Sequence, residues 1–272
     1  MMTDMILPEA RKFRKRSTFP AEAISWPFPP DDWLMGVAGI HVWAIPLDID
    51  ASLLGERQAT LAPIELERAA RFHFQRDRNR FVAGRGALRQ VLSRYLQAEP
   101  GKLHFNYGPH GKPSLAHSDM QNNLQFNLAH SEGLALLAVA HSGKIGIDLE
   151  CLRPLDDAEG LVTRFFCPRE IAAFQSLAET QKPAAFFNLW TRKEAWLKAI
   201  GEGIGHSLNL VEVSFLPGQS AHLLSIPEGP EAAAQWNLRD LAPAPGFAAA
   251  LAIQGPDLPL HCWRWSETRE QS

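Results

Sequence analysis

The stretch WTRKEAWLKAIGEGIG, residues 190–205, has the pattern of an amphipathic helix with charges set into its apolar side. At about 100° per residue, the apolar side chains in and before it fall within roughly a third of the helix circumference. Lys193 projects from the middle of this arc, while Glu194 and Lys198 lie side by side at one edge, as residues four apart do. The pattern predicts a helix buried in a core, with Lys193 partly buried beside the apolar residues. These are Phe186, Leu189, Trp190, Trp196, Leu197 and Ile200.

The three charges leave two interpretations open. In the first, Lys193 snorkels past its apolar neighbours, and Glu194 and Lys198 form an exposed ion pair worth only ~0.3–0.5 kcal/mol. In the second, the charges belong to a functional site, which requires a second acidic cluster elsewhere in the chain.

The composition is that of a globular protein with a sizeable core. The chain has 272 residues, 46% hydrophobic and 21% charged, enough for one large or two modest domains. A net charge of −3 and an isoelectric point near 6.4 argue against a broad nucleic-acid-binding surface. Three cysteines without zinc or disulfide spacing fit a reducing compartment. Since no membrane span or export signal is found, we expect a cytoplasmic protein with no membrane partner.

The order of predicted elements indicates an α+β fold of two similar halves. A strand at 41–48 precedes helices at 63–72 and 81–96 and adjacent strands at 124–131, 134–140 and 144–150. Helices return at 167–178 and 184–200, and short strands fill the remainder. The predicted organisation is a mobile N-terminal extension (1–36), an N-terminal half (37–143), a C-terminal half (144–262) and a tail (263–272).

A second acidic cluster occurs in KIGIDLE, residues 144–150. Strand alternation sends Asp148 and Glu150 to one face, about 7 Å apart. Like charges on one face repel unless a cation lies beside them, and Mg²⁺ typically takes one or two protein carboxylates with waters and substrate phosphates. The pair predicts a metal site in the C-terminal half, and a solvated edge face is the alternative.

Phosphates bound with Mg²⁺ need cationic side chains as well. Each candidate has a structural alternative, since helical arginines are often solvated and a histidine at a strand end often only forms a structural hydrogen bond. The GEGIG segment follows a helix and is no phosphate-binding loop, and no serine stands in a nucleophile-elbow context. The candidates are Arg68, Arg71, Arg80, Arg85, Lys112, His130, Lys193 and Lys198.

Four motifs in order are more specific than any of them alone: HGKP (110–113), FNLAHS (126–131), GIDLE (146–150) and WTRKEAWLKAIGEG (190–203). Together they resemble the signature of the Sfp-type 4'-phosphopantetheinyl transferases, and AARFHFQRDRNRF (69–81) resembles the arginine-rich segment of that family. The resemblance covers roughly residues 40–253. It implies a pseudo-dimer fold and Mg²⁺-dependent transfer of 4'-phosphopantetheine from CoA to a serine of apo acyl or peptidyl carrier proteins, with release of 3',5'-ADP.

The resemblance also implies roles for individual residues. Asp148, Glu150 and Glu194 match the metal-binding acids, and Glu194 is also a candidate general base. Lys198 matches a lysine near the phosphate under attack. Residues at positions that hold CoA phosphates are Arg68, Arg80, Lys112 and His130, and Lys193 is expected to line the same pocket.

The sequence departs from the family pattern at three positions. Ala129 stands where a serine is common, which removes one hydroxyl contact to CoA. Glu65 stands where some members carry a lysine, and Thr191 replaces the commoner serine.

Two other functions stay open at this point. The same site could hydrolyse CoA or another nucleotide with water, or the chain could dock carrier proteins without turnover. The intact set of three acids and Lys198 disfavours a pure binding module. Because both predicted halves lie in one chain, we expect a monomer.

Overall fold

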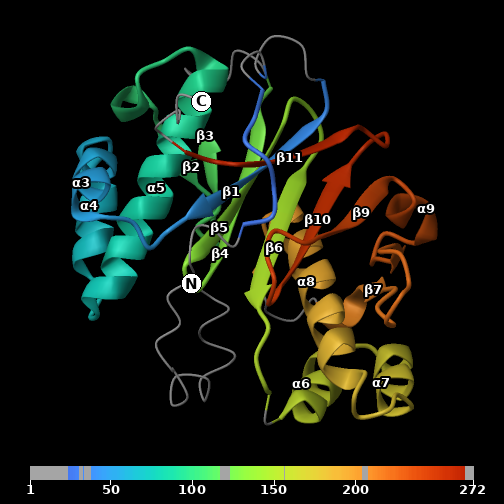
Figure 1. The fold of residues 1–272 in the computed structure, drawn as a ribbon. Helices are drawn as coiled ribbons and strands as arrows, with labels where there is room; N and C mark the ends of the chain where they lie inside the picture. The colour runs from blue at the N-terminus through green and yellow to red at the C-terminus, as the bar shows by residue number, and fades with distance from the viewer. Residues whose placement is uncertain are drawn as a thin grey trace. The chain divides into compact units, whose positions relative to one another are not determined.

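The computed structural model describes residues 24–30, 33, 38–116, 123–155, 157–203 and 208–266, which form two α+β units (Figure 1). The C-terminal unit is Ser142–Asp257. The N-terminal unit consists of the described residues of Ser17–His141 and Leu258–Ser272. The predicted α+β class and the division into two halves are confirmed.

The N-terminal unit is built on a four-stranded sheet in the order β11-β1-β5-β4. β1 pairs antiparallel with β5 and parallel with β11, and β4 pairs antiparallel with β5. The apolar side of α5 packs with the sheet residues in one core, and α3 and α4 lie against α5 (Figure 1). The elements are β1 (Ile40–Pro46), α3 (Ala51–Ala59), α4 (Pro63–Ala70), α5 (Gln75–Leu96), η3 (Pro100–Lys102), β2 (Phe105–Tyr107), β3 (Pro113–Leu115), β4 (Gln125–Ser131), β5 (Leu134–Ala140) and β11 (Leu260–Arg264).

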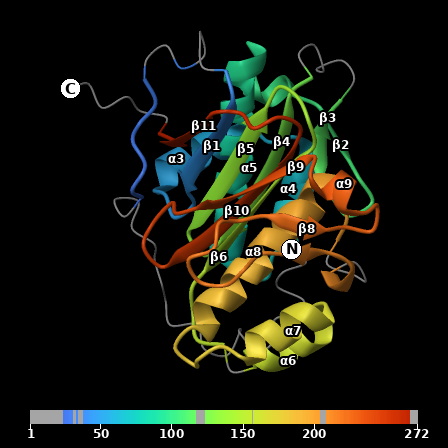
Figure 2. The ribbon, with the colours of Figure 1, turned by 90° about the vertical axis from the view of Figure 1, so that its right-hand side faces the viewer.

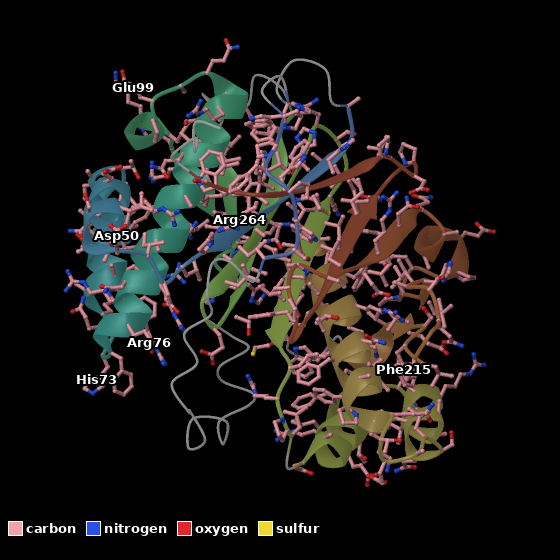
Figure 3. The ribbon with its side chains drawn as sticks, in the orientation of Figure 1. Asp50, His73, Arg76, Glu99, Phe215 and Arg264 are labelled. Carbon is pink, nitrogen blue, oxygen red and sulfur yellow. The ribbon has the colours of Figure 1, made fainter. Side chains whose placement is uncertain are left out.

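Local capping contacts stabilise the starts of two helices of this unit, α3 and α4. Asp50 (Figure 3) precedes α3 and accepts a hydrogen bond from the Leu53 amide at 2.9 Å. Pro63 opens α4, and the Glu65 carboxylate accepts from the Ala62 amide at 3.0 Å. These contacts satisfy amides that have no partner inside the helix.

The C-terminal unit carries a three-stranded antiparallel sheet in the order β6-β10-β9. The long helix α8 lies along β6 and β10 (Figure 2). It ends where Gly201 adopts a left-handed conformation, with φ of 81°. The elements are β6 (Ile145–Cys151), α6 (Ala158–Phe165), α7 (Pro168–Gln175), α8 (Lys182–Ile200), η5 (Leu208–Leu210), β7 (Glu212–Val213), β8 (Leu223–Ser225), α9 (Pro230–Ala233), β9 (Trp236–Leu241) and β10 (Phe247–Gln254).

The predicted apolar arc of α8 is confirmed, because five of its six residues are buried in the core of this unit and Ile200 packs against it. The other contact of α8 is with the backbone of β6. A Cβ atom at Gly146 would overlap the Ala195 carbonyl oxygen and the Ala199 amide nitrogen. Since Gly146, Asp148 and Glu150 alternate onto one face of β6, the acids lie on the face that α8 approaches.

The predicted neighbour of β6 was wrong. Residues 144–150 do not pair with 134–140 as expected, and β6 pairs with β10 instead. The reason lies at the turn before β6, where Gly143 takes a φ of 79° and the Gln254 amide donates to the Lys144 carbonyl. This turn directs the chain into a second sheet.

The ends of the chain also differ from the prediction. The predicted boundary between the C-terminal half and the tail, after residue 262, would divide β11. This strand pairs with β1 in the N-terminal unit. Within the predicted mobile extension, Ile24 is buried and the Trp33 ring packs 4.6 Å from that of Trp43. Residues 1–23, 31–32 and 34–36 of this extension and residues 267–272 lie outside the described residues.

Gly146→Ala should displace α8 from β6, because the new methyl group has no space against the helix backbone. Overpacking typically costs about 1–3 kcal/mol, and backbone neighbours place this change at the upper end. Gly55→Ala in α3 is the matched control, since no atom lies within 4 Å of its added Cβ and alanine favours a helix by about 0.5–1 kcal/mol. Urea unfolding measures both, and equal stability of the two variants would contradict the close approach.

Candidate active site

Two acids and a lysine meet where α8 covers β6, and a third acid, Glu150, acts on Glu194 electrostatically. Asp148 and Glu194 are 1% and 2% exposed, and Glu150 is also buried. The Lys198 ammonium donates a hydrogen bond to the Asp148 Oδ1 atom. The structure therefore brings Asp148 of β6 together with Glu194 and Lys198 of α8. Asp148 precedes them by 46 and 50 positions, and Glu194 and Lys198 lie on neighbouring turns of the helix.

Two carboxylate oxygens in this cluster have no hydrogen-bond partner. They are the Asp148 Oδ2 and Glu194 Oε1 atoms, and both are buried. A buried polar atom without a partner is destabilising, and more so when it carries charge. The described residues contain no group of three acid, histidine or cysteine side chains gathered around one metal position. Two carboxylates that each keep a partnerless oxygen nevertheless fit Mg²⁺, which takes one or two protein carboxylates and fills its other positions with water and phosphate.

The electrostatics of the cluster are set by burial and by the neighbouring charges. Burial raises the pKa of Glu194 to about 8; Lys198 opposes this shift, while Asp148 and Glu150 strengthen it. Burial works against the charge of Lys198, but Asp148 and Glu194 outweigh it and raise the lysine pKa. The lysine is therefore charged near neutral pH, where Glu194 is able to accept and release a proton.

Lys193 does not occupy the position that the resemblance implied. It is 0% exposed, and its Nζ donates to Glu170 Oε2 and, at 2.8 Å, to the Leu208 carbonyl. Burial lowers the pKa of Lys193, and the Glu170 carboxylate opposes that shift. Because its ammonium is enclosed with protein partners, the structure does not support Lys193 as a pocket-lining residue.

The other predicted cationic residues belong to the N-terminal unit. Arg80 on α5 holds Asp48 through two bonds of 2.7 Å and Glu132 at 3.1 Å. Burial works against its charge, but the two carboxylates raise the Arg80 pKa. His130 is exposed near the end of β4, two residues before Glu132. His130 and Glu132, the partner of Arg80, thus both lie near the C-terminal end of β4.

Arg85 is a buried cation that the resemblance left unassigned. It is 7% exposed, and its Nη1 atom is buried without a hydrogen-bond partner. Its guanidinium carbon lies 5.9 Å from the Phe81 ring and 5.6 Å from the Tyr107 ring, and that of Arg68 lies 5.5 Å from Phe81. Burial lowers the pKa of Arg85. In the sequence it is one of many arginines, and only burial distinguishes it.

Lys112 precedes β3 in the β2–β3 hairpin, which also carries Tyr107. Tyr107 pairs with Pro113, and the Gly108 amide donates to the Lys112 carbonyl at 2.9 Å. The hairpin therefore places Lys112 beside the tyrosine that Arg85 contacts. Arg68, Arg85 and Lys112 form the basic cluster of the N-terminal unit.

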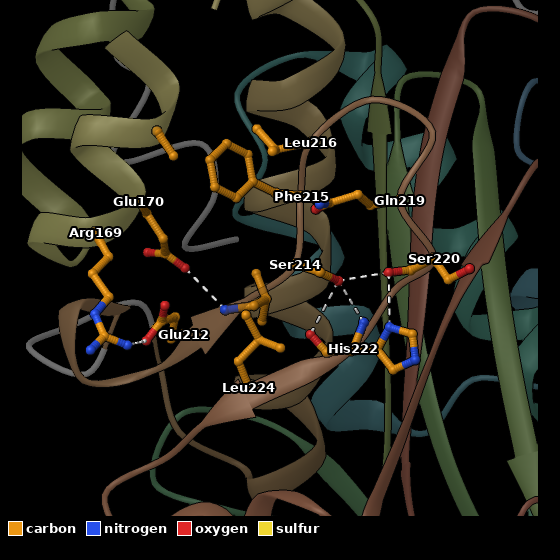
Figure 4. Close-up of a pocket in the computed structure, with 12 residues that line it drawn as sticks. Arg169, Glu170, Glu212, Ser214, Phe215, Leu216, Gln219, Ser220, His222 and Leu224 are labelled. Carbon is orange, nitrogen blue, oxygen red and sulfur yellow. Dashed lines mark hydrogen bonds and ion pairs between the residues drawn. The ribbon is translucent and has the colours of Figure 1, made fainter. Parts of the chain in front are cut away.

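A hollow of about 550 Å³ in the C-terminal unit is lined by none of the site residues predicted from the sequence (Figure 4). Ser214 and His222 both line it, but the His222 Nδ1 contacts the Ser220 carbonyl at 3.0 Å, and the Ser214 hydroxyl donates to that same carbonyl at 2.7 Å. The histidine ring and the serine hydroxyl thus share the Ser220 carbonyl as a partner and do not bond to each other. The hollow does not form a serine nucleophile site.

Comparison with known proteins identifies the family. The sequence model of the 4'-phosphopantetheinyl transferase superfamily matches residues 144–252, and that of the 4'-phosphopantetheinyl transferase N-terminal domain matches residues 54–142. The 4'-phosphopantetheinyl transferase HetI of Nostoc sp. (strain PCC 7120) is 45% identical over 229 residues, 84% of this chain and 93% of that protein. The 4'-phosphopantetheinyl transferase Sfp of Bacillus subtilis (strain 168) is 26% identical over 199 residues, 73% and 84% of the two chains. The chain belongs to the 4'-phosphopantetheinyl transferase superfamily and is an enzyme of that activity.

Among solved structures, Helicobacter pylori holo-[acyl-carrier-protein] synthase in complex with coenzyme A aligns with a TM-score of 0.29. The alignment has 24% identity and covers 41% of this chain and 99% of that one. A score this low supports no geometric argument. Separately, none of the helices among the described residues combines the length and apolar character needed to cross a bilayer.

Metal-free protein should lose stability relative to its Glu194→Gln variant as the pH rises from about 4.5 to about 8. Over this range the unfolded chain releases a proton that folded Glu194 retains, so ionisation favours unfolding. The difference between the two proteins changes by at most about 1.4 kcal/mol per pH unit. Urea unfolding in a chelator at several pH values measures it, and parallel stability curves would show that Glu194 ionises normally.

Proposed function

We propose that the acid cluster of β6 and α8 transfers 4'-phosphopantetheine from CoA to a serine hydroxyl of an apo acyl or peptidyl carrier protein. The observation that carries the proposal is the pair of buried, partnerless oxygens on Asp148 and Glu194 beside the Lys198 ammonium. Asp148, Glu150 and Glu194 are the residues that would hold Mg²⁺. The metal would neutralise charge on the CoA pyrophosphate.

The protein residues then have distinct tasks in the transfer. The serine oxygen attacks the β-phosphorus of CoA, the bond from that phosphorus to the bridging oxygen breaks, and 3',5'-ADP leaves. Glu194 is the candidate acceptor of the serine proton; burial disfavours its charged form, and a cation bound beside it would favour that form. Lys198 carries positive charge beside Asp148 and is suited to stabilise negative charge that develops on the pyrophosphate.

The basic residues of the N-terminal unit are assigned to the phosphates of the CoA nucleotide. Lys112, His130 and Arg68 keep the role that the resemblance implies, and Arg85 joins them because a buried guanidinium without a full set of partners favours an anion. Arg80 already holds Asp48 and Glu132, so it would have to share its donors to bind a phosphate. A single chain acting in the cytoplasm is proposed to be the functional unit.

Mass spectrometry of a panel of apo carrier proteins tests the proposal. Wild-type protein with CoA and Mg²⁺ should add one phosphopantetheine to a carrier and release 3',5'-ADP. Glu194→Gln should lower turnover ~10²-fold or more, since it removes a metal ligand and the proton acceptor. Consumption of CoA without a change in carrier mass would indicate a hydrolase, and carrier binding without turnover would indicate a docking module.

Arg85→Gln should raise the KM for CoA without lowering the melting temperature. A hydrogen bond to a charged group contributes about 1.5–3 kcal/mol, so the expected change is about 10- to 100-fold. Removing a buried charge that lacks a full set of partners should not destabilise the fold. Arg94→Gln is the control, because Arg94 is exposed on the same helix. An unchanged KM, or a KM change equal to that of Arg94→Gln, would remove Arg85 from the CoA site.

A further inference from the structure

A buried ion pair between Glu170 and Lys193 joins α7 to α8, and Lys193 immediately precedes Glu194 in the sequence. Glu170 is 2% exposed and Lys193 is fully buried. The Glu170 Oε2 atom accepts from the Lys193 ammonium and, at 3.2 Å, from the Cys167 amide. Its Oε1 atom accepts from the Val213 amide at 3.0 Å (Figure 4). Both carboxylate oxygens are thus bound by donors from three separate segments.

The lysine extends the same network. Its Nζ also donates to the Leu208 carbonyl at 2.8 Å, and it lies 4.7 Å from the centre of the Phe166 ring. The pair therefore fixes α8 against the start of α7 and against the segment from η5 to β7. Lys193 and Glu194 are successive residues, so their side chains leave α8 about 100° apart. Holding the Lys193 head in place sets the rotation of α8 about its axis, and with it the direction of Glu194.

Stability alone does not account for this pair. Taking two charges out of water is unfavourable, and a well-packed apolar pair is often as stable. The core around Lys193 already has large apolar groups, with Trp190 stacked on Phe186 at 5.8 Å and Leu197 fully buried. What an apolar pair would not supply is a directional set of hydrogen bonds that selects one rotation of the helix.

We propose that Glu170 is a positioning residue for the transfer reaction. Acting through Lys193, it sets the rotation of α8 and so aims Glu194 and Lys198 at Asp148. The catalytic part of this inference rests on the proposed function.

Four variants test it. Glu170→Gln keeps the size of the side chain, one acceptor oxygen and a residue type suited to the third helical position, but removes the charge that faces Lys193. Lys193→Met removes the ammonium and keeps an unbranched chain. The double variant removes both charges and leaves no buried charge unpaired. Val162→Ala, in the same core on α6, is a control that loosens packing without touching the pair.

A positioning role predicts a split between kinetics and stability. Glu170→Gln and Lys193→Met should lower kcat about 10- to 100-fold, the effect of a small misplacement of catalytic groups, with less change in the KM for CoA. The double variant should regain melting temperature while its kcat stays low. Hydrogen exchange should become faster in α8 peptides of the three pair variants, with Val162→Ala showing less change at an equal loss of melting temperature.

Two results would overturn the inference. One is recovery of kcat together with stability in the double variant, which would make the pair a stabilising contact only. The other is equal exchange of α8 in the pair variants and in Val162→Ala, a readout that requires no turnover. If wild-type protein modified no carrier, the proposed function would fail, and the exchange data would still decide whether Glu170 holds α8.

Discussion

The site depends on the contact between the backbones of α8 and β6 at Gly146. A side chain at this position would overlap the helix, so α8 approaches the strand only because residue 146 has none. The approach places Lys198 within hydrogen-bond reach of Asp148 and brings Glu194 under the influence of both strand acids. It also buries the acids, and burial gives Glu194 its unusual pKa. A packing contact between two backbones thus determines the electrostatics of the site.

Neighbouring charges on α8 have different environments and therefore different tasks. Arg192 has several protein partners, since it donates to Asp240 at 2.6 and 2.8 Å and to the carbonyls of Ser214 and Gln219. Lys193 donates to Glu170 and Leu208 on another side of the helix. Glu194, the next residue, keeps a buried oxygen without a partner. Two cations with protein partners hold the helix, and the acid beside them keeps an oxygen available to a ligand.

The sequence predicts what depends on local periodicity and fails where a distant partner decides. The helical arc around Trp190 and the alternation that puts Asp148 and Glu150 on one face both follow from the period of a single element, and the structure has both. Pairing of β6 with β10 depends on a strand about one hundred residues later, and an apolar strand pattern does not specify its neighbour. The predicted role of Lys193 is wrong for a similar reason. A buried lysine suits either a ligand site or an ion pair, and the residue that decides between them, Glu170, lies on another helix.

Whether a buried charged group has hydrogen-bond partners indicates a ligand site in this protein better than its residue type does. Arg89 and Arg85 are both buried, but Arg89 donates to Glu65 and to two carbonyls, whereas Arg85 keeps a buried nitrogen without a partner. The indole nitrogens of Trp190 and Trp196 are also partnerless, so the criterion is informative only for charged groups, whose desolvation is far more unfavourable. Among the described residues it then selects two acids, Asp148 and Glu194, and three arginines, Arg76, Arg85 and Arg153. Acids of this kind suit a divalent metal, and guanidinium groups of this kind suit a phosphate.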